Sequence, residues 1–150
     1  MTERTLVFLK PAGLELFENQ IVTKLADAGA LVGCGMFVPS RERMEKHYAV
    51  HRDRDFFASL VEYHAGKEMF ALVLEGEDVI SRVRKLCGAT LPKDAAPGTI
   101  RALGAGMFPD VEAWDVLRRQ GKNADNLVHS SDSHGSAAYE IQLWFPHLKP

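Results

Sequence analysis

Apolar residues recur along the chain with two different periods that alternate from one end to the other. Short apolar runs bounded by proline, glycine or charged residues are typical of buried strands. They predict strands at 5–9, 31–38, 69–74 and 127–128. Apolar residues three or four positions apart predict helices. These are expected over 14–28, from Ser40 onward, within 52–61, over 78–86 and over 133–145.

The strands and helices alternate without a long linker or an internal repeat. A chain of 150 residues can bury one sizeable core, so we expect 1–150 to form a single domain. The order of the elements fits the split βαβ, or ferredoxin-like, pattern. The predicted fold is therefore of the α+β class: a ferredoxin-like α/β sandwich in which helices pack on an antiparallel sheet of about four strands.

Composition adds limits to this picture. The formal net charge of −2 argues against a dedicated binder of nucleic acid or anionic membranes, so any phosphate site must be local. The first apolar run is too short for a secretion signal and none is long enough to span a bilayer, which predicts a cytoplasmic protein. Cys34 and Cys87 lie in apolar segments, which predicts reduced, buried thiols rather than a disulfide or a metal pair.

Two patterns that often mark a ligand site are incomplete here. The glycine pairs in 33–35 and 104–106 complete neither GxGxxG nor GxxxxGK[ST], so Rossmann and P-loop sites are set aside. His47 and His51 stand four residues apart, but no acidic residue completes HExxH. The alternatives for these two histidines are metal ligands on one helical face and a solvated helix face.

One histidine near the C-terminus, His129, precedes a run of small polar residues, 130–133. A neutral imidazole is nucleophilic at physiological pH, and small polar neighbours can fix its tautomer and leave room for a phosphoryl group. The alternative is a surface turn before a helix, because Ser133 followed by Ser136 and Glu140 would make a good helix N-terminus.

Glu140 falls on the inward stripe of the final predicted helix, between Ala137 and Trp144. A carboxylate at such a position needs a partner. It is either a glutamate at the edge of the core paired with an arginine, or a group that reaches back to His129 or Ser131 and orients the imidazole.

A second set of polar residues lies between 84 and 101. Arg84, Thr90 and Arg101, taken singly, are typical of a solvated surface. Together they supply two planar guanidinium groups and a hydroxyl, which are the donors that polyphosphate oxygens need. Lys10 stands at the rigid end of the first predicted strand, directly before Pro11.

These residues and their order resemble the nucleoside diphosphate kinase family over nearly the whole chain. The last stretch, 126–133, is similar to the family's Asn-x-x-His-Gly-Ser-Asp-Ser signature. The other matching segments are 3–11, 47–48, 54–61, 75–76 and the helix after it, 88–90 and 97–101.

The resemblance implies reversible transfer of the γ-phosphate of a nucleoside triphosphate, such as ATP, to a nucleoside diphosphate by a ping-pong mechanism through a phosphohistidine at His129. It implies Mg²⁺ as cofactor, bound mainly through the nucleotide phosphates, and a homo-oligomer that is a dimer, tetramer or hexamer. The catalytic residues that it implies are Lys10, Tyr48, Asn126, His129, Ser131 and Glu140. The nucleotide-binding residues that it implies are Lys10, Phe56, Leu60, Arg84, Thr90, Arg101 and Asn126.

The sequence departs from the family pattern in several places. Ala12 stands where the family has aspartate, and the helix entry that follows it looks shorter than usual. Ser130 replaces the signature glycine, so its backbone must avoid positive φ or tolerate strain. The family's Gly-Asp-Phe after Arg101 is replaced at 102–104, and we expect the short C-terminal tail to lack the extension that packs on a neighbouring subunit.

The 102–125 segment is longer than is usual in the family and reads as an insertion. Its pattern predicts a short amphipathic helix that begins near Asp110, buries Val111, Trp114 and Leu117, and ends near Gly121. The basic residues in it are a solvated edge or contacts to bound nucleotide. They are Arg118, Arg119 and Lys122.

Two other classes of function remain to be weighed. A non-catalytic nucleotide-binding relative could have its site reshaped by the insertion, but the complete polar set, Lys10, Tyr48, Asn126, His129 and Glu140, argues against it. A ferredoxin-like regulatory domain unrelated to phosphoryl transfer would leave that set unexplained.

Overall fold

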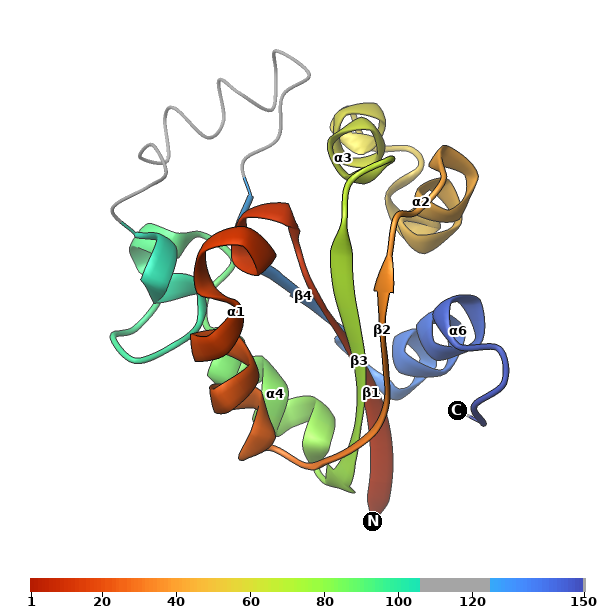
Figure 1. The fold of residues 1–150 in the computed structure, drawn as a ribbon. Coiled ribbons are helices and arrows are strands. Elements are labelled where there is room, and N and C mark those ends of the chain that lie inside the picture. The colour runs from red at the N-terminus through yellow and green to blue at the C-terminus, as the bar shows by residue number, and fades with distance from the viewer. Residues whose placement is uncertain (106–124, 150) are drawn as a thin grey trace.

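The computed structural model describes residues 1–105 and 125–149, which form one four-stranded antiparallel sheet with helices on both faces (Figure 1). The strands are β1 (Thr2–Leu9), β2 (Ala30–Phe37), β3 (Met69–Glu77) and β4 (Val128–Ser130), in the spatial order β2-β3-β1-β4. The helices are α1 (Pro11–Ala26), α2 (Arg41–His47), α3 (Phe57–His64), α4 (Val79–Cys87) and α6 (His134–Trp144). This confirms the predicted ferredoxin-like α/β sandwich.

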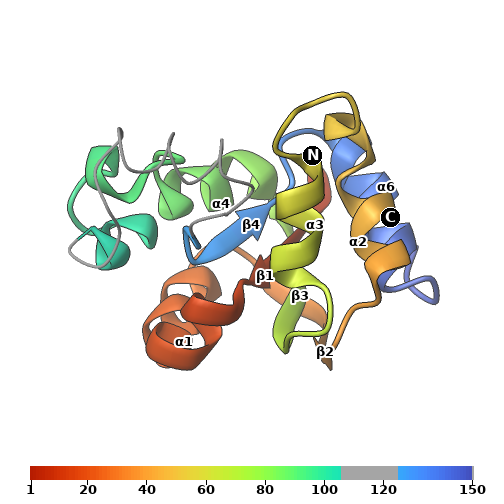
Figure 2. The same ribbon diagram turned by 90° about the horizontal axis from the view of Figure 1, so that it is seen from above.

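The sheet has a core on each face. Helices α1 and α4 cover one face, and α2, α3 and α6 lie on the other (Figure 2). Successive side chains of a strand point to opposite faces, so β1 sends Val7 and Leu9 into the first core and Leu6 and Phe8 into the second. This explains why the 5–9 run has no polar alternation.

Local capping follows the sequence signals. The Ser40 side chain accepts a hydrogen bond from the Arg43 backbone N–H at 3.1 Å and starts α2. Ser133 and Ser136 form a reciprocal capping box at the start of α6. Pro11 occupies the first turn of α1, where its missing N–H costs nothing. These caps fix the ends of the helices that flank the pocket described below.

Two sequence-based expectations about exposure are wrong. Cys34 is exposed, because β2 is an edge strand whose outer face also leaves Leu31 and Met36 about half exposed; Cys87 is buried as expected. His47 is only 6% exposed and ends α2, so it does not lie on a solvated helix face. His51 belongs to a separate 3-10 turn, 49–51, so the two histidines do not share a helix.

Some expectations lie beyond what is described. The helix predicted within 102–125, with Trp114 and the basic residues near it, falls within 106–124, outside the described residues.

The expected helical segment within 52–61 begins later, at Phe57, because the preceding residues form turns. Among the helices that the structure describes, none is long and apolar enough to cross a membrane.

Candidate active site

A pocket of about 930 Å³ opens between the end of β1, the α2–α3 hairpin, α4, β4 and α6. All the site residues expected from the sequence line it except Ser131, which is fully buried behind it. Elements far apart in the chain therefore bring the expected set together. The expected residues that line the pocket are Lys10, Tyr48, Phe56, Leu60, Arg84, Thr90, Arg101, Asn126, His129 and Glu140.

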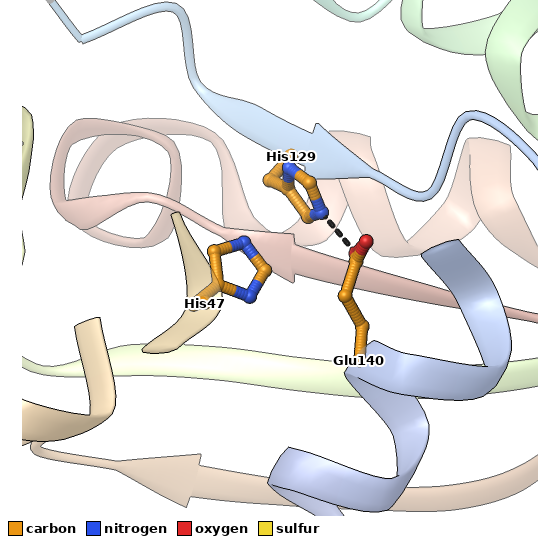
Figure 3. Close-up of side chains that lie close together, drawn as sticks. All are labelled: His47, His129 and Glu140. Carbon is orange, nitrogen blue, oxygen red and sulfur yellow. Dashed lines mark hydrogen bonds and ion pairs between the residues drawn. The ribbon is translucent and has the colours of Figure 1, made fainter. Parts of the chain in front are cut away.

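His129 lies in the middle of the short strand β4, opposite Phe8 of β1. Its ring stacks on the Phe8 ring at 4.7 Å between centroids, and its Nε2 contacts the Glu140 carboxylate (Figure 3). No described residue makes a hydrogen bond to Nδ1. Burial, reinforced by Lys10 and Arg101, holds the pKa of His129 well below its usual value, so the imidazole is neutral at physiological pH.

Glu140 projects from α6 into the base of the pocket. Its Oε1 contacts His129 and accepts a hydrogen bond from Ser131 Oγ at 3.1 Å. Burial raises the pKa of Glu140 to about 7. Of the two partners considered from the sequence, no arginine among the described residues pairs with it. An imidazole that donates Nε2–H to this carboxylate leaves the Nδ1 lone pair facing away from it.

His47 is the residue of this site that sequence reasoning missed. It packs edge-on against His129 at 4.5 Å between ring centroids, and burial holds its pKa well below the usual value. Trp144 Nε1 donates a hydrogen bond to His47 Nδ1 at 3.0 Å, so the proton of the neutral ring is on Nε2. The available signal was the helical spacing of Met44, His47 and Tyr48, which marks a buried face.

His47, His129 and Glu140 also form the one group of described side chains whose spacing suits a metal ion, with potential ligand atoms within 4.8 Å of one another. The hydrogen bonds argue for a different use. Because Trp144 engages Nδ1 of His47, the other ring nitrogen carries a proton and is a donor rather than a ligand. This cluster therefore suits proton placement better than metal binding.

Three cationic side chains line the same pocket as His129. Lys10 is buried at the end of β1; burial and Arg101 lower the pKa of its ammonium to about 8, and Asp125 opposes them. Arg101 donates to the carbonyls of Gly88 and Val128 at 2.9 and 3.0 Å. The third cation, Arg84, is exposed. Within the described residues, none of Lys10, Arg84 and Arg101 forms an ion pair. They can therefore bind a phosphorylated ligand.

Neutral polar groups complete the wall. Asn126 donates to the carbonyl of Thr90 at 3.0 Å, while its Oδ1 and the Tyr48 hydroxyl are buried without a hydrogen-bond partner among the described residues. Buried polar atoms of this kind are usually satisfied by a ligand or water. Ser130 pairs with Val7 in the sheet and avoids positive φ, so the loss of the signature glycine leaves no backbone strain there.

The fold and the pocket define a class: a ferredoxin-like α/β sandwich whose neutral histidine faces cations across a pocket suited to phosphorylated ligands. The family model described as nucleoside diphosphate kinase matches residues 3–149. The nucleoside diphosphate kinase of Prochlorococcus marinus (strain NATL2A) is 41% identical over 145 residues, which is 95% of this chain and 86% of the relative. The chain belongs to the nucleoside diphosphate kinase family, which is a family of phosphotransferases.

Other relatives agree in sequence and in structure. The nucleoside diphosphate kinase of Synechococcus sp. (strain WH7803) is 39% identical over 146 residues, covering 96% of this chain and 86% of the relative. A transition-state mimic of the Borrelia burgdorferi enzyme with bound vanadate and ADP has a TM-score of 0.81 at 30% identity, over 96% of this chain and 87% of that one. An NDP kinase from Pyrobaculum aerophilum has a TM-score of 0.81 at 28% identity, over 97% and 96%.

Proposed function

We propose that this chain is a nucleoside diphosphate kinase that moves the γ-phosphate of a nucleoside triphosphate, typically ATP, to a nucleoside diphosphate through phosphorylated His129. The observation that carries the proposal is the contact of His129 Nε2 with Glu140 in a pocket lined by cations. This contact leaves Nδ1 as the nucleophile. Membership of the family and the vanadate and ADP bound by the Borrelia relative support the same reaction.

The step at His129 needs no prior deprotonation. The Nδ1 lone pair forms the N–P bond, the bond from the γ-phosphorus to the bridging oxygen breaks, and its electron pair leaves with the nucleoside diphosphate. The Nε2 proton stays on the ring, which becomes cationic. The Glu140 carboxylate, held by Ser131, stabilises that charge. The second nucleoside diphosphate then attacks the phosphorus and restores neutral His129.

The remaining residues bind the nucleotide. Lys10, Arg84 and Arg101 neutralise charge on the phosphates, the Thr90 hydroxyl donates a hydrogen bond to them, and the Tyr48 hydroxyl donates near the transferred phosphoryl group. Asn126 and Lys10 hold the ribose. The apolar side chains of Phe56 and Leu60 stack on the base and read little of its identity, so broad nucleotide tolerance follows. These residues are named by the family resemblance and line one pocket.

Mg²⁺ is the cofactor that fits this donor set. Hard cations prefer oxygen ligands, and Mg²⁺ in phosphoryl transfer is bound largely through substrate phosphates. The pocket offers two carboxylates: Glu140 is buried and already engaged, and Asp132 is exposed at its edge. When bound, Mg²⁺ would offset the negative charge of the phosphates. The protein side chains listed above would place the phosphates rather than the metal.

The assembly and compartment remain proposals. We propose a homo-oligomer of at least two subunits, with the 102–125 segment in a subunit contact or at the rim of the nucleotide cleft. Light scattering at micromolar concentration should give at least a dimer, and Trp114→Ala should weaken assembly or nucleotide binding without preventing phosphorylation of His129. A monomer in light scattering would contradict the proposed oligomer. If Trp114→Ala changed only the thermal stability, the insertion would have no functional role. The cytoplasmic location expected from the sequence stays a prediction.

The kinetic test of the proposed reaction is the pattern of initial rates. Because the phosphorylated enzyme discharges onto a second nucleotide in the same pocket, double-reciprocal plots at several concentrations of the second nucleotide should be parallel. Intersecting lines would support direct transfer in a ternary complex instead. Nucleotide binding without turnover would identify a non-catalytic relative.

A further inference from the structure

Asp125, which precedes β4 and is buried, joins three separate parts of the site. Its Oδ2 accepts hydrogen bonds from the backbone N–H of Ala12 in α1 and from the Tyr63 hydroxyl in α3, both at 2.7 Å. Its Oδ1 accepts one from the backbone N–H of Leu127, also at 2.7 Å. Hydrogen bonds to an ionised carboxylate are short and strong, so this residue ties the three segments together.

These bonds fix the place where Lys10 leaves the sheet. The backbone N–H of Lys10 donates to the Leu127 carbonyl at 2.8 Å. On the other side of Pro11, the Asp125 carboxylate accepts a hydrogen bond from the Ala12 backbone N–H. Leu127 has a positive φ of 76°, a conformation that needs support in a residue other than glycine. The bond from its N–H to Asp125 supplies that support. Lys10 and Asn126 are therefore presented from one rigid junction.

Asp125 also acts on Lys10 through its charge. Burial and Arg101 lower the pKa of Lys10 to about 8, and Asp125 raises it. The other titratable groups around Lys10 come from three further elements: His47 from α2, His64 from α3 and His129 from β4. Burial keeps these three neutral. Asp125 is thus the carboxylate that supports a charged Lys10 near neutral pH.

We propose that Asp125 is a positioning residue: its carboxylate locks the junction that presents Lys10 and Asn126 to the nucleotide and keeps Lys10 cationic. The inference rests on the proposed function, because Lys10 and Asn126 matter only if nucleotide binds there. It also accounts for Ala12, where the family has aspartate. A carboxylate from position 125 reaches the backbone of the same residue.

The test is the affinity for ADP, measured by calorimetry at pH 6 and pH 8 for the wild type and Asp125→Asn. At pH 8 Lys10 is about half charged, and loss of the Asp125 charge lowers its pKa further, so a smaller fraction is charged and the variant should bind several-fold more weakly. At pH 6 both proteins keep Lys10 charged, so the loss there reports the loosened junction alone and should be smaller than the loss at pH 8. Asp27→Asn, an exposed aspartate at the other end of α1, should match the wild type at both pH values.

Two further variants sharpen the result. In a protein that already carries Lys10→Met, Asp125→Asn should cause no further pH-dependent loss of ADP affinity, because the lysine ammonium that Asp125 supports is absent. Ala12→Asp combined with Asp125→Asn restores a carboxylate to the junction and should recover the affinity at pH 8. If Asp125→Asn alone does not fold, the double variant still tests the proposal. Weak binding of ADP by the double variant at pH 8 would count against it.

An equal loss at both pH values, or none, would overturn the proposal. Failure of the proposed function would look different. The wild type would then not become phosphorylated on His129 by ATP, whereas the ADP measurements would still decide the role of Asp125.

Discussion

His129→Ala should abolish phosphoryl transfer, with kcat lower by on the order of 10⁴-fold or more, as expected when the nucleophile of a covalent mechanism is removed. Alanine cannot form the N–P bond, and the neighbouring buried histidine, His47, carries its proton on Nε2 while its Nδ1 accepts a hydrogen bond from Trp144. A coupled assay of nucleoside triphosphate formation measures the loss.

The cations and polar groups that bind nucleotide stay in place in this variant, so ADP affinity should change little. His134→Ala is the matched control, because His134 is exposed and pairs with Glu3 at the surface. It should retain wild-type activity. Substantial turnover by His129→Ala would contradict the assignment of the nucleophile.

The second large effect is expected from Glu140→Gln. This change should lower kcat by roughly tenfold to a hundredfold, the scale for losing a partner that orients a reacting group, while KM changes little. The amide keeps the size of the side chain but loses the charge that stabilises the phosphorylated, cationic imidazole. Steady-state rates at saturating nucleotide separate kcat from KM.

The pH profile gives this prediction a second readout. Burial raises the pKa of Glu140 to about 7, so the wild-type rate should fall as pH falls through this value. Below it the Glu140 carboxylate takes up a proton and loses the negative charge that stabilises the cationic, phosphorylated imidazole. The acid limb should disappear in Glu140→Gln and persist in the exposed control Glu18→Gln. An unchanged kcat and an unchanged acid limb would make Glu140 a core residue only.

The order of elements could be predicted because it is carried by local periodicity. The apolar run at 5–9 became β1, whose alternate side chains fill two cores, and Ser40 and Ser133 capped the helices that they precede. Properties that depend on the neighbours of an element could not be read in this way. Cys34 is exposed because β2 is the edge of the sheet, and strand order is set by contacts far apart in sequence.

The site shows the same division. Helical spacing placed Glu140 on the inward face of α6, but its contact with His129 of β4 depends on how α6 packs against β1, the strand that pairs with β4. Spacing alone also missed His47, because its neighbour Trp144 lies 97 residues away in the chain. Asp125 joins the site through hydrogen bonds to α1 and α3, which no local sequence pattern predicts. The roles of the site residues stay predictions.

The most direct test of the central claim is the intact mass of the protein after incubation with ATP and Mg²⁺ in the absence of an acceptor. The wild type should gain one phosphoryl group per chain, and the modification should be labile in acid and stable in base, as a phosphoramidate is. His129→Ala should gain none, and adding a nucleoside diphosphate should discharge the wild type. An unmodified wild type, label that persists in His129→Ala, or acid-stable label would contradict transfer through phosphorylated His129.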